Sequence, residues 1–161
     1  MKKLHIILAS VIVLAAIIYF TGLYTYFIRT EINEELPSAS PVAETSVMPS
    51  PRVLAEGNFG KIDVVHQGSG QAKLVEIGDA RIVRLENFSV VSGPDLYVYL
   101  TTSSTPTGDP ASLGDFINLG LLKATMGNQN YDIPAGTADD YRTVVIWCKR
   151  YGVLFTFAVM Q

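Results

Sequence analysis

A long uncharged stretch near the N-terminus constrains this chain more than any other feature. Residues 4–28 contain no Asp, Glu, Lys or Arg. A helix rises about 1.5 Å per residue, so one of this length can cross a hydrocarbon core of about 30 Å. Two lysines precede the stretch, and three glutamates follow soon after Arg29. The positive-inside rule therefore predicts a single-pass protein of the cell membrane, with a cytoplasmic N-terminus and an extracytoplasmic C-terminal part.

A cleaved signal peptide is the alternative interpretation of the same stretch. Signal peptides have an apolar core of about 7–15 residues and end in small residues before the cleavage site. Here the apolar run is longer, and aromatic residues crowd its end between Tyr24 and Arg29. We therefore favour an uncleaved signal anchor, formed by residues 1–29, that attaches the chain to the membrane as a transmembrane helix.

Proline and polar residues dominate the next segment. Residues 30–52 are rich in Glu, Ser, Ala and Thr, and four prolines there remove backbone donors and fix their own φ angles. No apolar period is visible in this segment. We expect a flexible linker between the anchor and a folded domain that spans residues 53–161.

The pattern of the folded part predicts an all-β domain, either a sandwich or barrel-like. Short apolar runs alternate with turn residues, and no run shows the i, i+3, i+4 spacing of an amphipathic helix. About eight short antiparallel strands fit either architecture, and the pattern does not choose between them. The expected strands are residues 61–67, 71–77, 80–88, 96–101, 116–122, 129–133, 143–148 and 153–160.

Local patterns within this domain predict details of register and faces. A two-residue loop at Gly78 and Asp79 suits a hairpin, which places Glu76 opposite Arg81 as a pair of opposite charge. Strict alternation over residues 96–100 predicts three aliphatic side chains on one strand face and two tyrosines on the other.

Two segments outside the strands also have recognisable patterns. Residues 102–113 are rich in Thr, Ser, Pro and Gly, which predicts a loop at one end of the sheet. Thr137, with Asp140 three residues later, is typical of a single capped helical turn.

Charge and composition exclude several function classes. The formal net charge is -3 at pH 7, and the lysines and arginines form no basic cluster, so we expect no nucleic-acid partner. The chain has one cysteine and two histidines, with His5 inside the apolar stretch. An intramolecular disulfide, a multi-cysteine zinc site and a blue-copper centre are therefore excluded within this chain, and we expect no metal site.

Cys148 is the residue that carries the most chemical interest, and three interpretations of it stay open. It shares a strand face with Val144 and Ile146, which favours a buried structural thiol. Lys149 and Arg150 follow at once, and nearby cations lower the pKa of a thiol, which favours a reactive one. The sulfur can also serve as the ligand of a prosthetic group.

Three segments carry a recognisable pattern: Asn87-Phe-Ser with Ser92-Gly-Pro-Asp-Leu-Tyr-Val-Tyr-Leu100, Leu119-Gly-Leu-Leu-Lys123 with Gly127-Asn-Gln-Asn-Tyr-Asp-Ile-Pro134, and Tyr141-Arg-Thr-Val-Val-Ile-Trp-Cys148 with Phe155 and Ala158. Together they resemble one family, the DM-thirteen or electron-transfer DM domain, over about residues 53–161. The resemblance implies an all-β extracytoplasmic domain with a redox role, in which Cys148 acts as a redox thiol or ligates a prosthetic group such as haem. It also implies a separate redox partner protein in the envelope. Beside Cys148, the candidate haem ligands are His66, Met126 and Met160, and covalent attachment is excluded because no Cys-x-x-Cys-His motif occurs.

Two other functions compete with electron transfer. A non-enzymatic binding or adhesion module could present loops such as residues 102–113 to an extracytoplasmic ligand, with a structural cysteine in its core. A purely structural envelope component is the third candidate. Hydrolytic catalysis is not expected, because the sequence shows no Ser-His-Asp set, no phosphate loop and no paired carboxylates.

Overall fold

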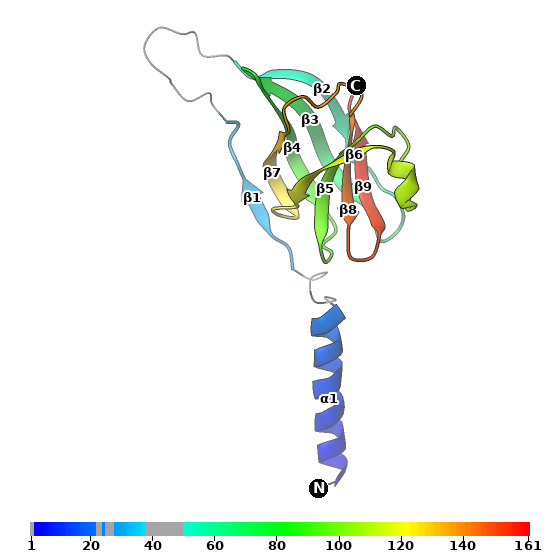
Figure 1. Cartoon of the computed structure of the whole chain (residues 1–161). Helices are drawn as coiled ribbons and strands as arrows, with labels where there is room; N and C mark the ends of the chain where they lie inside the picture. Colours follow the sequence, from blue (N-terminus) through cyan, green and yellow to red (C-terminus); the bar gives the residue numbers. More distant parts are fainter. Residues whose placement is uncertain (1, 22–23, 25–27, 38–49) are drawn as a thin grey trace.

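A computed structural model describes residues 2–21, 24, 28–37 and 50–161 of the chain. It consists of one N-terminal helix, α1 (Lys2–Thr21), and a β domain that stands on the C-terminal end of this helix (Figure 1). The helix has a mean hydropathy of 2.5 and no buried residue. By length and composition it is therefore a candidate membrane span. Most of the expected anchor beyond Thr21 lies outside the described residues.

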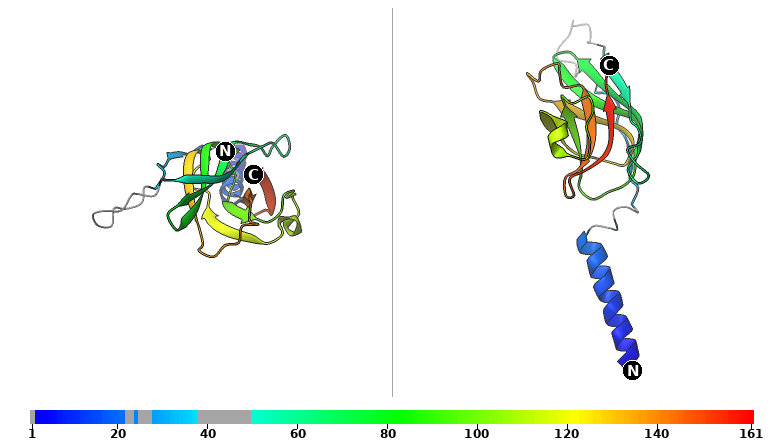
Figure 2. Two further views of the ribbon diagram at one scale, coloured as in Figure 1. Left: turned by 90° about the horizontal axis from the view of Figure 1, so that it is seen from above. Right: turned by 90° about the vertical axis from the view of Figure 1, so that its right-hand side faces the viewer.

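Two β-sheets form the domain and pack face to face as a sandwich (Figure 2). The described strands form two separate sheets, so the sandwich alternative is confirmed over a closed barrel. The first sheet has the order β1 (Glu31–Asn33), β7 (Met126–Ile133), β4 (Ala80–Val90), β3 (Gly68–Ile77) and β2 (Arg52–Asn58). The second has the order β6 (Phe116–Leu121), β5 (Leu96–Thr101), β8 (Thr143–Cys148) and β9 (Val153–Val159).

The main core lies between the sheets, where the alternating strand faces meet. Leu96, Val98 and Leu100 point into this core, as the alternation predicts, together with Cys148 and its neighbours on β8. Tyr99 lies on the opposite face, in a second cluster with Trp147. The loop expected at residues 102–113 covers that cluster with Leu113, which belongs to a 3₁₀ turn, η2 (Pro110–Leu113).

The β3–β4 hairpin confirms the expected register. Gly78 adopts a positive φ of 61° in the loop, and Glu76 lies opposite Arg81. These two residues nevertheless form ion pairs with other partners. Glu76 binds Arg52 of β2 and Arg81 binds Asp139, each at 2.7 Å, because a neighbouring strand and a loop bring competing charges within reach.

Two expected elements do not form. Residues 61–67 are a loop with an isolated bridge between Lys61 and Gln67, where a strand was predicted. The Asp63 carboxylate accepts hydrogen bonds from the backbone N–H groups of Val65 and His66, and such side-chain bonds compete with a strand ladder. Residues 137–140 form turns without a helical segment, and the Thr137 hydroxyl donates backwards to the Pro134 carbonyl, so it caps no helix.

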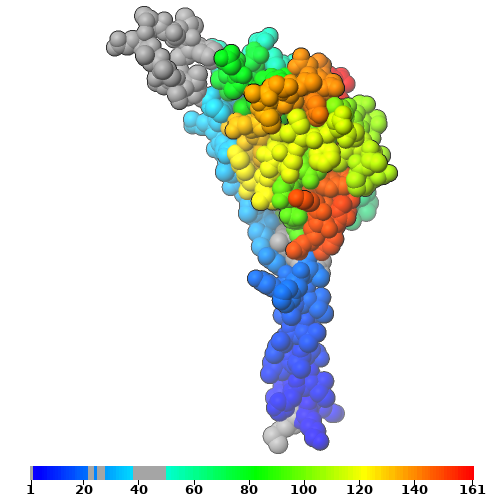
Figure 3. Space-filling model, in the orientation of Figure 1, coloured from blue at the N-terminus to red at the C-terminus, as the bar shows by residue number. Residues whose placement is uncertain are grey.

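The first part of the expected linker is built into the sheet. β1 pairs in parallel with β7 at its edge, and the amide of Met126 donates to the Thr30 carbonyl. In Figure 3 this segment lies flat against the flank of the domain. Residues 38–49 of the expected linker fall outside the described residues, and the proposed boundaries at 29 and 52 remain predictions.

Candidate functional site around Cys148

Cys148 is the last residue of β8 and is completely buried, with 0% of its surface exposed. Its sulfur donates a hydrogen bond to the Pro94 carbonyl oxygen at 2.9 Å. Pro94 belongs to the turn that leads into β5, whose first residue, Leu96, lies opposite Cys148 in the sheet. The thiol therefore stands where the end of one strand meets the beginning of its neighbour.

The turn before β5 has a sequence that this contact requires. A Cβ atom on Gly93 would lie 2.5 Å from the Phe155 ring, so glycine is needed for the close approach of turn and ring. Asp95 adopts a positive φ of 63°, and its carbonyl accepts the amide of Lys149 at 3.0 Å. Backbone bonds thus hold the turn against the end of β8 on both sides of Pro94.

The electrostatics of this position keep the thiol protonated. Burial raises the pKa of Cys148 and is the largest effect, and the Asp95 carboxylate acts in the same direction. The backbone amides of Tyr151 and Arg150, and the charge of Arg150, oppose the rise in pKa without cancelling it. The lowered pKa expected from the adjacent cations is therefore wrong, because desolvation outweighs them. At neutral pH the group is a neutral thiol that serves as a hydrogen-bond donor.

His66 lies at the same end of the sandwich. Its ring packs edge-on against the buried ring of Phe155, with centroids 4.7 Å apart, and Phe155 belongs to the same core cluster as Cys148. The Nδ1 atom of His66 is 2.7 Å from the Asp63 carboxylate. Hydrogen bonds from His66 and Val65 lower the pKa of Asp63 to about 2. This imidazole therefore has one nitrogen engaged within its own loop.

Comparison with protein-family models gives one match, described as Electron transfer DM13, over residues 59–160. The chain belongs to the electron-transfer DM13 family. The resemblance inferred from the sequence is thereby confirmed, and the DM13 domain contains both the Pro94 turn and Cys148. No curated protein and no solved structure matches the chain.

Of the other two candidate ligands of the DM13 domain, Met160 lies far from Cys148 and Met126 belongs to the opposite sheet. Met160 is buried, but it follows the far end of β9, whose first residue, Val153, pairs with Cys148. Seven residues of extended chain separate Val153 from Met160, or roughly 23 Å at about 3.3 Å per residue. Met126 begins β7 in the opposite sheet, beside β1.

These positions do not fit the ligation of one haem iron by the expected residues. The Cys148 sulfur is buried and bonded to a carbonyl, one nitrogen of His66 is bonded to Asp63, and Met160 follows the far end of β9. Met160 instead fills the core at the far end of the sandwich. The sulfur of Cys148 is the group at this site that has redox chemistry of its own.

A cavity of about 340 Å³ lies beside the Pro94 turn of the DM13 domain. Ser92, Gly93, Asp95 and Leu96 form one wall. The opposite wall comes from the segment that follows the helix, and the Ser92 hydroxyl donates to the Ile28 carbonyl across the gap. The residue that pairs with Cys148 across the sheet, Leu96, therefore also borders an open hollow.

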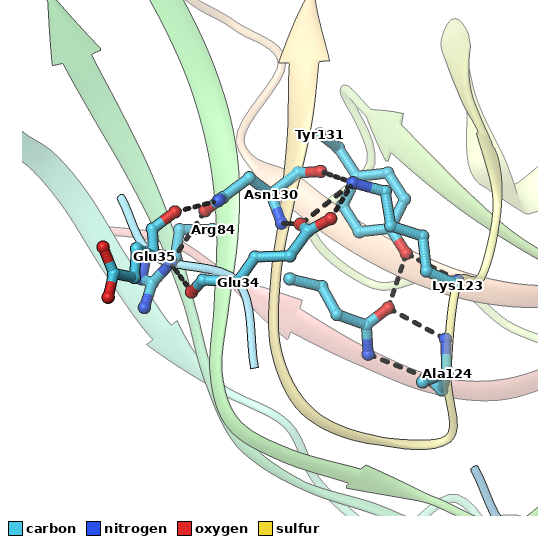
Figure 4. Close-up of polar contacts among 8 residues, drawn as sticks. Glu34, Glu35, Arg84, Lys123, Ala124, Asn130 and Tyr131 are labelled. Carbon is cyan, nitrogen blue, oxygen red and sulfur yellow. Dashed lines mark hydrogen bonds and ion pairs between the residues drawn. The ribbon is translucent and has the colours of Figure 1, made fainter. Parts of the chain in front are cut away.

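A polar network that the sequence did not reveal attaches β1 to the domain (Figure 4). Arg84 is only 7% exposed, and it donates to the Glu34 carbonyl and to the Asn130 side chain. The Glu34 carboxylate accepts from Lys123 at 2.8 Å and from the Asn130 amide at 2.7 Å. Burial acts to raise the pKa of Glu34, but these hydrogen bonds bring it below its usual value.

The network continues inward through an uncharged pair. The buried Gln129 side chain makes two bonds to the backbone of Ala124 and accepts from the Tyr131 hydroxyl at 2.7 Å. Burial raises the pKa of Tyr131 far above its usual range. Because these polar groups all have partners, the network stabilises the fold and offers no free group for catalysis. In the sequence, the sign of this network is Arg84, a charged residue between the apolar residues Val83 and Leu85 of β4.

Proposed function

We propose that this protein is a membrane-anchored, extracytoplasmic electron-transfer domain whose redox group is the sulfur of Cys148. DM13 membership and the apolar helix support the proposal. The strongest support is a hydrogen bond from the Cys148 thiol to the Pro94 carbonyl. This bond joins two segments of the family pattern that are separate in the sequence, the Pro94 turn and the end of β8.

A single thiol can undergo exchange with a disulfide of a partner protein. The Cys148 thiolate attacks one partner sulfur, a new S–S bond forms, and the old S–S bond breaks. The proton of Cys148 ends on the released partner thiol, so that a thiol and a disulfide give a mixed disulfide and a thiol. A thiol of a second protein must then attack the partner sulfur of the mixed disulfide, because this chain has no other cysteine. A disulfide forms between these two proteins, the bond to Cys148 breaks, and the proton of the attacking thiol ends on Cys148.

The buried thiol must become exposed before it can react. The exposed residues Lys149 and Arg150 follow Cys148 directly, and only the Pro94 carbonyl receives its hydrogen bond. Local opening of a loop requires less free energy than unfolding of a core. We therefore propose a closed resting form, in which the β8–β9 turn or the Pro94 turn moves to uncover the sulfur.

Native-state thiol modification tests this proposal on the full chain in detergent micelles. The rate at which a small aromatic disulfide modifies Cys148 is compared with the rate of global unfolding. The matched control is a Cys148→Ala chain with Val144→Cys, which places a thiol on the same face of β8 at another fully buried position. We expect Cys148 to react at least about tenfold faster, equivalent to about 1.4 kcal/mol less opening free energy. Equal rates for both thiols, matching global unfolding, would exclude a redox role of Cys148.

A binding module with a structural cysteine is the second candidate function. Complete burial of Cys148 and its role as a donor to Pro94 favour it. In that case Cys148→Ala leaves binding to the envelope partner intact, whereas substitutions in the loop at residues 102–113 abolish it. Crosslinking of the full chain in membranes, followed by mass spectrometry, distinguishes the two outcomes.

The proposed orientation has its own test. Trypsin added to intact cells reaches the exposed Arg142, just before β8, only if the β domain lies outside the membrane. We expect cleavage of the domain without cell lysis. Protection in intact cells with cleavage after lysis would overturn the extracytoplasmic location.

A further inference from the structure

An apolar loop projects from the domain at residues 61–66. Val64 is 82% exposed, Val65 51% and Ile62 37%. Single exposed aliphatic residues are common on soluble domains, but three within four positions form a patch that requires an explanation. None of these three side chains belongs to a hydrophobic core cluster, so core packing does not explain why they are apolar.

The loop has a defined shape. Its Asp63 carboxylate accepts two backbone amides and the His66 ring nitrogen, and the Ile62 amide donates to the His66 carbonyl. The buried Phe155 ring packs edge-on against the His66 ring. Internal bonds therefore hold Val64 and Val65 at the tip, pointing away from the core.

The loop and the β8–β9 turn lie at the end of the domain that carries α1. The hydroxyl of Thr156 on β9 donates to the Gly60 carbonyl, which joins the loop to the β8–β9 hairpin. Arg150 and Tyr151 of that turn both donate to the Thr21 carbonyl at the last residue of the helix. Figure 2 shows the loop and the turn at the lower part of the domain, toward the helix.

The chain length between helix and domain restricts the distance to the membrane. Seven residue steps join Thr21 to Ile28, which span at most about 25 Å when fully extended. β1 begins three residues later and is fixed in the sheet. A bilayer that contains α1 must therefore lie close to this end of the domain.

The charges at this end suit a lipid surface. Lys61, Lys149 and Arg150 are exposed there, and half-exposed Tyr151 offers an aromatic ring of the kind that membrane interfaces favour. The carboxylates at this end include those of Asp63, which is bonded within its own loop, of Asp95, and of Glu31, which accepts a hydrogen bond from Asn33. Cations beside an apolar tip match anionic headgroups above an acyl layer.

We propose that residues 61–66 and 149–151 form a membrane-contact surface that rests on the outer leaflet of the bilayer spanned by α1. Val64 and Val65 enter the boundary between headgroups and acyl chains, while Lys149 and Arg150 lie at the lipid phosphates. The proposal rests on the membrane anchorage of the proposed function. It directs the Pro94 turn and Cys148 toward the membrane, so a redox partner must approach along the bilayer surface.

Depth-dependent quenching tests the contact with the full chain in nanodiscs of zwitterionic and anionic phospholipid. An environment-sensitive fluorophore is attached to Val64→Cys in a Cys148→Ala background. The matched control carries it at Asp79→Cys, in the exposed β3–β4 turn at the opposite end of the domain. We expect blue-shifted emission and quenching by nitroxide-labelled lipid at position 64, and neither effect at position 79.

A second comparison covers folding and charge. A fluorophore at Tyr151→Cys should be quenched by the same lipid, and Val65→Asp should reduce that quenching in chains whose circular dichroism is unchanged. Flotation with the nanodiscs reports anchorage separately. A chain that does not float contradicts the membrane anchor of the proposed function, whereas a floating chain with an unquenched label at position 64 overturns this inference alone.

Discussion

At the scale of single residues, the environment of Cys148 depends on a neighbour without a side chain. Gly93 allows the Phe155 ring to approach the turn before β5, and the next residue, Pro94, offers its carbonyl to the thiol. Phe155 in turn supports His66. The position of the sulfur and the shape of the apolar loop therefore depend on the same buried ring.

Gly93→Ala tests this dependence. The added methyl group would overlap the ring of Phe155, and overpacking of a dense core costs about 1–3 kcal/mol. We expect the free energy of unfolding to fall by that amount in denaturant titration, with faster modification of Cys148. Gly108→Ala is the control, because a Cβ there has no heavy atom within 4 Å. Equal effects of the two substitutions would contradict the role of Gly93.

At the scale of secondary-structure elements, β1 is the least expected strand, and it holds the segment that follows α1 against the domain. It is three residues long, and Thr30, directly before it, forms hydrogen bonds with Thr125, 95 residues further along the sequence. Its stability comes from the side chains around it, chiefly the bonds from Arg84, Lys123 and Asn130 to Glu34.

Glu34→Gln should loosen this strand. The substitution removes the charge that Lys123 and the Asn130 amide bind, and a partly exposed charged hydrogen bond contributes about 1 kcal/mol. We expect faster hydrogen exchange at the Met126 amide, which donates to Thr30, with little change in the centre of β8. Glu35→Gln is the matched control, because that side chain is exposed. Unchanged hydrogen exchange at the Met126 amide in both variants would show that the Glu34 carboxylate does not stabilise the pairing of β1 with β7.

Sequence patterns predicted those elements whose determinants are local. The Gly78-Asp79 loop and the alternation at residues 96–100 specify a register and two faces without knowledge of the rest of the chain. β1 was missed because its partner strand lies far along the sequence and its own residues are mostly polar. The valines of residues 61–67 favour a strand by their propensity. The Asp63 carboxylate nevertheless holds this segment as a loop, through hydrogen bonds from the amides of Val65 and His66 that no apolar pattern reveals.

The candidate site was predictable only in part, for the same reason. The inward face of Cys148 follows from period-two alternation, and its burial was one of the interpretations left open. Its distance from Met160 depends on the direction of β9, and its contact with Pro94 depends on how β5 pairs with β8. These are tertiary relations that no local pattern contains.

At the scale of the whole molecule, several carboxylates bind cations or amides in the folded state. Hydrogen bonds from Lys73 and Arg84 lower the pKa of Glu86, and the pKa of Glu34 is lowered as well. The pKa of Asp63 falls to about 2 from 3.8. Each group therefore stabilises the fold in its ionised form.

Acid should destabilise the domain in a defined range. A lowered folded-state pKa contributes stability that is complete above the unfolded pKa, here 3.8 to 4.5, and that is lost as the pH falls through the folded value. We expect the free energy of unfolding to decrease steadily below about pH 4.5. Denaturant titrations at successive pH values measure it, and Glu86→Gln should flatten the slope. A free energy that stays constant from pH 5 to pH 3 contradicts these ionised pairs.

β1 and β2 occupy opposite edges of one sheet, and residues 38–49 connect them along the sequence. In the membrane-bound arrangement that we propose, this proline-rich segment adds nothing to the height of the domain above the lipid, because it leaves the sheet at one edge and returns to it at the other. Lengthening or shortening it would then leave the clearance between Cys148 and the bilayer unchanged. A few residues inserted between Thr21 and Ile28 would instead lift the entire sandwich and separate its sulfur from a partner confined to the membrane plane.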